Sequence, residues 1–350
     1  MSDSKFKVEF TLKQHTPIIH FQSDQSGATL RATELKPKFD RFLIKLNNQN
    51  IKPSKGPQGE LYFDYKVKIT IKTCEIKPIP KSPPHPLYFA RDNKEFSTGK
   101  LQIEFIAFDD KLIAIIKEEF PKFLAITNFG SRSSKGYGSF WDEKTMSTTF
   151  VNFAKKYYPK IYKLEKKVQK DTWEKIVGDF YKMVKMGNNH PHRPELYKKA
   201  YLWEYFAKDN IRWEKRQIKK EFPILAVSKN GNKPIDVQNP KDESFRFIRA
   251  MLGLAGHYEF RLPNQKDSEK VTIACNDNEI KRMRSPIEFK IIGDTVYLLC
   301  NEHYKKLYGK SFKFTYKGKP FNITTPSQNE FDLYKFMDYL VQRNLLKVAQ

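Results

Sequence analysis

The sequence predicts an α+β fold with two domains joined by a helical insertion. Residues near both ends of the 350-residue chain alternate apolar and polar side chains with the period of two that is typical of half-buried strands. Other stretches space their apolar residues as helices do, and residues 151–220 show only this helical spacing. We therefore expect domains at 1–150 and 221–350, with the helical insertion at 151–220 between them.

The first domain has six predicted elements. They are a strand at 6–13, a helix from 37 to about 47, strands at 65–72 and 101–107, a helix from 110 and a strand at 123–128. Pro37 suits the first turn of its helix, and Asp110 is the expected cap of the second. Strand, helix, strand, strand, helix, strand is the split βαβ order of ferredoxin-like folds.

The insertion and the second domain follow. Residues 151–220 contain 19 Lys and Arg against 8 Asp and Glu, a net charge of +11. In the second domain we expect a strand at 222–227, a helix at 245–252, hairpins turning at Gly293–Asp294 and Lys317–Gly318, and a final helix that begins at the capping box of Ser327 and Glu330.

The charge of the chain points to a polyanionic partner. Lys and Arg number 64 against 40 Asp and Glu, so the formal net charge is +24. A chain with 39% hydrophobic and 14% aromatic residues folds rather than remaining a disordered basic tail, and nucleic acid is the commonest partner of such a protein. No long charge-free apolar run predicts a membrane span, and the polar N-terminus does not resemble a signal peptide. Three widely spaced cysteines are typical of a reduced, cytoplasmic protein.

A glycine- and serine-rich basic loop between Phe129 and Phe140 is the sharpest local feature. Glycines let the backbone approach a ligand, successive N–H groups can bind an anion, and cations and a tyrosine ring suit phosphates and bases. Its candidate RNA-binding residues are Gly130, Ser131, Arg132, Ser133, Ser134, Lys135, Gly136, Tyr137 and Gly138. An exposed basic loop without a ligand would have the same composition. The spacing fits neither a Walker loop nor a dinucleotide fingerprint.

Two further basic segments are candidates for the same ligand. Arg31, Lys36, Lys38 and Arg41 surround a predicted helix start, where free N–H groups attract phosphate. Arg282 and Arg284 flank Met283 in the run from Lys281 to Pro286. A solvated helix start and an ordinary exposed turn are the competing interpretations.

Catalytic patterns are weak, and the sequence predicts no metal or cofactor. No histidine lies in a metal-binding spacing with carboxylates. His20 and Lys36 are the candidates for metal-independent acid–base cleavage of RNA, although His20 follows the apolar pair Ile18 and Ile19 and equally suits a packed position.

Three of these segments resemble the RAMP-superfamily subunits of CRISPR effector complexes. Thr16-Pro17-Ile18-Ile19 followed by Leu30-Arg31-Ala32-Thr33-Glu34-Leu35-Lys36 is similar to the opening of that superfamily. The loop Gly130 to Ser139 is similar to its Gly-Ser-Arg-Ser loop, and Arg282 to Ile287 resembles its Arg-x-x-Ser-Pro element. The match is best with the first subunit of type III-B (Cmr) complexes. The start of the first helix departs from the family's Trp-rich pattern, and residues 151–220 match nothing residue by residue.

The resemblance implies two ferredoxin-like, RRM-like RAMP domains and a non-catalytic RNA-binding subunit of an antiviral ribonucleoprotein. Such a subunit would hold the 3′ region of the CRISPR RNA, help capture target RNA and contact other subunits of the complex. A RAMP endoribonuclease that processes precursor RNA is the alternative, and a nucleic-acid-binding protein unrelated to CRISPR is a third.

Overall fold

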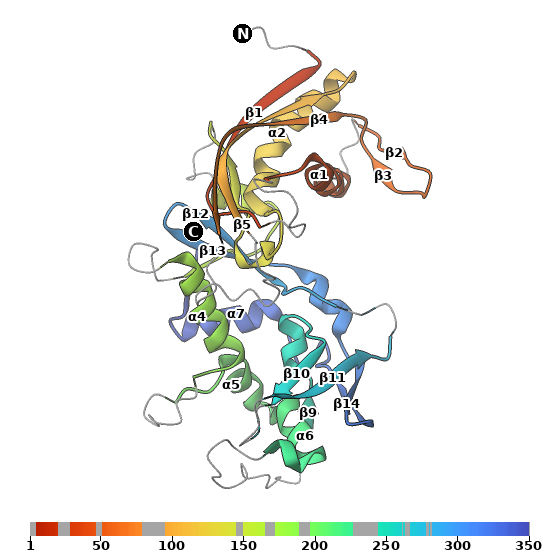
Figure 1. Cartoon of the computed structure of the whole chain (residues 1–350), viewed down its shortest axis with the longest axis vertical. Coiled ribbons are helices and arrows are strands. Elements are labelled where there is room, and N and C mark those ends of the chain that lie inside the picture. The colour runs from red at the N-terminus through yellow and green to blue at the C-terminus, as the bar shows by residue number, and fades with distance from the viewer. Residues whose placement is uncertain are drawn as a thin grey trace. The chain divides into compact units, whose positions relative to one another are not determined.

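The computed structural model divides into two compact units, which Figure 1 shows together. It describes residues 5–19, 29–46, 51–78, 95–144, 150–164, 172–188, 197–226, 244–260, 262, 267–277, 280 and 282–349. The first unit contains Met1–Val177, Glu288–Leu299 and Lys347–Gln350, and the second contains Gly178–Ile287 and Cys300–Leu346. Both units are therefore discontinuous in sequence, whereas the predicted domains are contiguous segments.

An antiparallel four-stranded sheet forms the centre of the first unit. Its strands are β1 (Lys7–Gln14), β4 (Lys66–Pro78), β5 (Glu95–Ile106) and β6 (Phe140–Asp142), in the order β4-β5-β1-β6. Helices α1 (Ala32–Leu46) and α2 (Asp110–Ile126) cover one face (Figure 1). The order of strands and helices predicted for the first half is present here, with a small hairpin of β2 (Ser54–Lys55) and β3 (Leu61–Tyr62) added after α1.

Aromatic side chains fill the space between this sheet and its helices. Phe39 of α1 is fully buried, and its ring centroid lies 5.3 Å from that of Phe120 and 5.8 Å from that of Phe105. Phe10 of β1 lies 4.8 Å from Phe120. The alternation that predicted β1, β4 and β5 is thus the signature of a sheet with one face against a helical layer.

Helix α1 begins five residues before the predicted start. Pro37 lies inside the helix instead of in its first turn, on the exposed side. Leu35 is fully buried together with Phe39, so the apolar stripe extends one turn toward the N-terminus. Burial of this turn outweighs the backbone hydrogen bond that proline removes.

The prediction for α2 is wrong at both ends. Asp109, not Asp110, is the N-cap, and its carboxylate accepts from the N–H of Lys111 at 2.9 Å. Residues 123–126 of the strand expected at 123–128 are the last turn of α2, because Phe123 and Leu124 lie on the buried face of the helix with Phe120. The fourth strand of the sheet is β6, beyond the glycine loop.

A second sheet lies mostly in the first unit and has the order β12-β13-β7-β16. It contains β7 (Tyr162–Leu164), β12 (Ile287–Ile292), β13 (Thr295–Cys300) and β16 (Leu346–Val348). The hairpin predicted at Gly293–Asp294 is confirmed. The segment expected to be purely helical contributes β7 here, after the short helix α3 (Phe150–Ala154).

The second unit contains an antiparallel sheet of order β10-β11-β14-β15. Its strands are β10 (His257–Phe260), β11 (Glu269–Cys275), β14 (Ser311–Tyr316) and β15 (Lys319–Thr324), and β14 and β15 form the hairpin predicted at Lys317–Gly318. The other elements that lie in or extend into this unit are α4 (Trp173–Lys185), α5 (Tyr201–Ala207), β8 (Ile211–Trp213), α6 (Glu214–Glu221), η4 (Pro223–Ala226), β9 (Ser244–Arg246), η5 (Ile248–Leu252), η6 (Glu302–Leu307) and α7 (Leu333–Gln342).

Three predictions for this half are corrected. The expected strand at 222–227 is the 3-10 turn η4, in which Leu225 and Ala226 are buried. The expected helix at 245–252 is strand β9, paired in parallel with β8, followed by the 3-10 helix η5. Asp332 caps α7, while the Ser327 N–H donates to Glu330 at 2.7 Å in the turn before it. The 3-10 segments η4 and η5 bury apolar residues without a regular period, so the spacing of apolar residues could not identify them.

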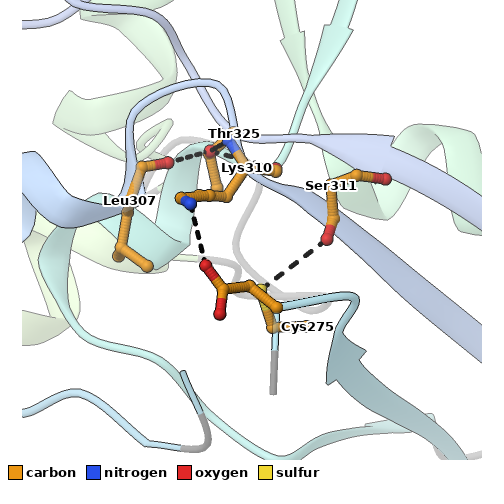
Figure 2. Close-up of polar contacts among 6 residues, drawn as sticks. Cys275, Leu307, Lys310, Ser311 and Thr325 are labelled. Atoms are coloured by element: carbon orange, nitrogen blue, oxygen red, sulfur yellow. Dashed lines mark hydrogen bonds and ion pairs between the residues drawn. The ribbon is translucent and has the colours of Figure 1, made fainter. Parts of the chain in front are cut away.

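Side-chain contacts join the ends of β11, β14 and β15 (Figure 2). The Thr325 hydroxyl donates to the Leu307 carbonyl and accepts from the Lys310 N–H at 2.9 Å. The Cys275 thiol donates to the Ser311 carbonyl at 3.7 Å. Cys74, Cys275 and Cys300 are all free thiols, and burial raises the pKa of Cys300.

Candidate nucleic-acid interface

The glycine loop of the first unit leaves α2 at Asn128 and returns to β6 at Ser139, where these two residues form a β-bridge. Gly136 and Gly138 have φ angles of 94° and 67°. A Cβ atom on Gly138 would lie 2.0 Å from the Phe129 carbonyl oxygen, and one on Gly136 would lie 2.1 Å from Cδ1 of Ile291. These glycines are required for close packing within the protein, while their predicted contact with a ligand stays a prediction.

Most of the N–H groups that were candidates for an anion site have partners in the protein. Those of Gly130, Ser131 and Gly138 donate to Glu34 Oε1 at 2.8 Å, the Ile19 carbonyl at 2.7 Å and the Pro17 carbonyl at 2.8 Å. The N–H groups of Lys135 and Gly136 close the 3-10 turn η1 (Ser133–Lys135). The prediction of a backbone anion site is therefore wrong for these five amides, and the side chains remain as the candidate ligand contacts.

Four side chains of the loop are partly accessible. Arg132 has a φ of 56°, in the left-handed region, and begins η1. Arg132, Ser133, Ser134 and Lys135 are all half-buried, which leaves two cations and two hydroxyls on one turn. Because internal hydrogen bonds anchor the backbone on both sides of this turn, these groups are displayed on a rigid support.

Tyr137 does not offer the predicted stacking face. Its side chain is 3% exposed, and its ring centroid lies 4.7 Å from that of Trp173 in an edge-to-face contact. Burial raises its pKa, with the nearby charge of Glu174 as a smaller cause. The tyrosine therefore serves the core beneath the loop.

Two candidate cations of α1 form hydrogen bonds within the first unit. Lys36 Nζ donates to Asp40 at 2.9 Å and to the Phe63 carbonyl at 2.8 Å, and it lies 4.1 Å from the centre of the Tyr65 ring. Lys38 Nζ donates to Glu34 at 2.8 Å and to the Asn128 carbonyl at 3.0 Å. These lysines join α1 to β3 and to the glycine loop.

The other two cations of α1 lie nearer to solvent. Arg31, just before the helix, is half-buried, and Arg41 is exposed. Both belong to the same unit as the glycine loop, and Lys38 and Glu34 connect their helix to it. Arg31, Arg41, Arg132 and Lys135 are all at least partly accessible and remain the candidate phosphate contacts of the first unit.

Arg282 and Arg284 belong to the second unit and form a separate local set. Both are exposed, on either side of the half-buried Met283, whose carbonyl accepts from the Leu254 N–H at 2.9 Å. His303 Nε2 contacts the Arg284 carbonyl at 3.0 Å. The segment is thus held by its backbone and presents its guanidinium groups outward, while Lys281 lies outside the described residues.

Sequence reasoning missed the lysine that fixes the base of the glycine loop. Lys290 is 1% exposed, and its Nζ donates to the carbonyls of Leu124 at 2.7 Å and Thr127 at 2.9 Å, at the C-terminal end of α2. Burial lowers its pKa to about 7. All six residues of β12 are buried, so the apparent alternation from Ile287 to Ile291 did not mark an exposed face.

Asn128 and Ser139 complete this attachment. Asn128 Nδ2 donates to the Ser133 carbonyl at 2.8 Å and to the Phe289 carbonyl at 2.7 Å. Ser139 Oγ donates to the Ile291 carbonyl at 3.1 Å. Both ends of the loop are therefore joined to β12, a contact that no local sequence signal predicts.

The two candidates for acid–base cleavage are not brought together among the described residues. His20 lies outside the described residues, and Lys36 is engaged as above. Burial lowers the pKa of His15 to about 4, and the charges of Lys290 and Lys13 add to this effect, so it stays neutral at pH 7. Within the described ranges, His, Cys, Asp and Glu side chains nowhere gather in a group of three that could hold a metal ion.

Comparison with known proteins identifies the family. The sequence model of the Cmr1 N-terminal domain matches residues 5–188, and that of the Cmr1 C-terminal domain matches residues 197–349. The chain belongs to the Cmr1 family. Membership makes this Cmr1-family chain a subunit of a type III-B CRISPR complex, as the resemblance of its motifs implied.

One solved structure of the same family is similar over nearly the whole chain. It is the apo form of Cmr1 from Pyrococcus furiosus, with 10% sequence identity, a TM-score of 0.40 and 98% of each chain covered. No curated protein matches the sequence. Among the helices that the structure describes, none is long and apolar enough to cross a membrane.

Proposed function

We propose that this Cmr1-family chain is a non-catalytic RNA-binding subunit of its complex. It holds the 3′ region of the CRISPR RNA and helps to capture target RNA in antiviral defence, and its two halves derive from ferredoxin-like RAMP domains. The observation that carries the proposal is the display of Arg132 and Lys135 on one turn whose backbone is anchored to α1, β6 and β12. Cations on a rigid support contact phosphates without reading sequence.

The remaining accessible arginines extend this function. Arg31 and Arg41 supply further phosphate contacts in the first unit, and Arg282 and Arg284 supply them in the second. Lys36 and Lys38 act indirectly, because their ammonium groups hold α1 against the loop. Ser133 and Ser134 offer hydroxyls to phosphate or ribose oxygens.

The test is the double variant Arg132→Ala with Lys135→Ala, measured by fluorescence anisotropy against several unrelated RNAs at a series of salt concentrations. Loss of two phosphate contacts should weaken binding to every RNA and reduce the slope of log K against log salt by roughly 1.4 to 1.8. Lys111→Ala with Lys144→Ala removes the same charge from two exposed positions of the same unit and is the matched control. Equal affinities and slopes for the two double variants would refute the loop assignment.

The competing function is a metal-independent endoribonuclease that uses His20. The internal hydrogen bonds of Lys36 favour the binding function, because this lysine is not free to assist proton transfer. Incubation of the pure protein with repeat RNA in chelator separates the two functions. We expect no site-specific cleavage, whereas cleavage that His20→Ala abolishes would establish the enzyme.

A further inference from the structure

We propose that a second RNA-contact surface, specific for unpaired bases, lies in the second unit around Trp203. This inference rests on the proposed RNA-binding function and assigns it an additional site. The site combines the Trp203 ring, on which a base would stack, with Lys199 and Arg212, which would contact the adjoining phosphates. It lies in the basic segment whose role the sequence left open.

The geometry brings the two cations to one aromatic ring. Lys199 Nζ lies 4.3 Å from the centre of the Trp203 ring, and the guanidinium carbon of Arg212 lies 5.5 Å from it. Lys199 precedes α5, Trp203 lies within it, and Arg212 lies in β8. Asn210, with a φ of 57°, permits the turn that joins α5 to β8. Trp203 is half-buried, so part of this residue is accessible to solvent.

Residues 197–221 have eight Lys and Arg against four Asp and Glu, and two of these carboxylates are paired with arginines from elsewhere. Glu204 of α5 lies 3.4 Å from Arg343, and Glu214 of α6 lies 2.6 Å from Arg249. Hydroxyls of Tyr339 and Tyr258 also donate to these two carboxylates. Apart from Lys208, whose ammonium group lies over the Tyr339 ring, the cations of residues 197–221 are Lys198, Lys199, Arg212, Lys215, Arg216, Lys219 and Lys220.

The ring and its two cations are the parts that bind single-stranded nucleic acid, in which bases stack on aromatic side chains while cations follow the backbone. The other tryptophan of this segment, Trp213, lies in β8 next to Arg212, so its side chain points to the opposite face of the strand. The guanidinium carbon of the buried Arg249 lies 5.4 Å from the centre of the Trp213 ring, so this tryptophan is not part of the proposed site. A paired base hides its face within the duplex, so the surface should select unpaired RNA.

A cation–π contact elsewhere in the second unit involves a buried ring and therefore provides a control for the Trp203 site. Lys208 Nζ also lies 4.3 Å from an aromatic ring, that of Tyr339. Tyr339 is only 4% exposed, so no base can replace the lysine there. At Trp203, by contrast, an incoming base can displace the ammonium group toward the phosphate that accompanies it.

The experiment uses the full chain with a labelled oligoadenosine and with a fully paired RNA duplex. Trp203→Leu, and separately Lys199→Ala with Arg212→Ala, should each weaken oligoadenosine binding about fivefold or more, with less than about twofold effect on the duplex. Lys208→Ala with Lys305→Ala is the control for the lost charges and should bind as wild type does. Oligoadenosine should also quench tryptophan fluorescence in the wild type, and less so in Trp203→Leu. Thermal unfolding verifies that each variant is folded.

Several outcomes would overturn the inference. Unchanged oligoadenosine affinity and quenching in both variants would remove the site, as would an equal loss of affinity for duplex and single strand. Loss of binding to other complex subunits with normal RNA affinity would make the surface a protein contact instead. If Arg132→Ala with Lys135→Ala weakens RNA binding while the Trp203 variants do not, the proposed function stands and only this site fails. A wild-type chain that binds no RNA would refute both.

Discussion

The glycine loop and the Trp203 segment are both basic, but the fold uses their charges differently. Around the loop, Lys36, Lys38 and Lys290 direct their ammonium groups at carbonyls and carboxylates of the first unit. In residues 197–221, the Trp203 segment, arginines from distant positions pair with two of the carboxylates, and Lys199 lies over an indole ring. The number of cations in a segment is therefore a poor guide to the charge it presents, because partners from elsewhere decide which groups are already engaged.

The largest expected effect concerns the buried ion pair beneath the Trp203 segment. Arg249→Met should lower the free energy of unfolding by about 3 to 5 kcal/mol, because it leaves the carboxylate of the fully buried Glu214 without its cation. Urea unfolding measures the change. Arg343→Met removes the partner of Glu204 at a half-exposed pair and should cost less than about 1 kcal/mol. Similar costs would mean that the two carboxylates are neutralised in the same way.

The second largest effect is expected for Gly138→Ala, which tests whether this glycine of the loop is needed for close packing. Gly138→Ala should destabilise the chain by at least about 2 kcal/mol, since it adds a left-handed alanine and a methyl group against the Phe129 carbonyl. Gly178→Ala is the matched control, because Gly178 lies in α4 with open space at the Cβ position, and it should be neutral or stabilising. Thermal unfolding of both variants decides the point. A stable Gly138→Ala protein would restore the idea that this glycine is kept for a ligand.

A third effect is expected in the pH dependence of stability. Burial lowers the pKa of Lys290 from 10.5 to about 7, so the unfolded chain binds more protons than the folded one between these values. This group therefore adds stability as pH rises from about 7 to 10, and none of that gain is present below pH 7. The free energy of unfolding should rise with pH across this range in the wild type and should change less with pH in Lys290→Met. If the free energies of unfolding of the two proteins change with pH in parallel, the carbonyl partners of Lys290 keep its pKa at the usual value.

The smallest effect concerns two single cations, Lys38 of α1 and Arg132 of the glycine loop. Lys38→Gln should leave RNA affinity within about twofold of wild type while lowering stability by about 1 kcal/mol, because its ammonium group hydrogen-bonds Glu34 and the Asn128 carbonyl. Arg132→Gln should lower RNA affinity more than Lys38→Gln does, because Arg132 is a proposed phosphate contact. Anisotropy and urea unfolding of the two single variants provide the comparison. A larger loss of RNA affinity in Lys38→Gln than in Arg132→Gln would reverse the assignment.

Local patterns predicted the regular elements of the first half well. Alternation predicted β1, β4 and β5, and helical spacing predicted α1, because each element has one face on a single core. The same reasoning failed at 123–128, where the helical stripe of α2 continues past Pro121, and at 222–227 and 245–252, where short 3-10 segments are buried without a period.

The candidate site was predictable as a location but not as a set of contacts. The glycine- and serine-rich loop and its cations stand out in the sequence, and the motifs indicated the family that domain matches later confirmed. The burial of Tyr137, the internal hydrogen bonds of the loop amides and the role of Lys290 depend on residues up to 166 positions away. Composition alone carries no information about such pairings.

The sequence by itself determined the family, the basic character and the main strands and helices, because these depend on composition, motifs and local periodicity. Only the tertiary structure decided which cations are displayed. Residues 288–299 return to the first unit and place Lys290 under the glycine loop, while Arg249 and Arg343 pair with the carboxylates of the Trp203 segment. A charge is available to a ligand only when no nearer partner desolvates or neutralises it, and the partners here come from distant parts of the chain.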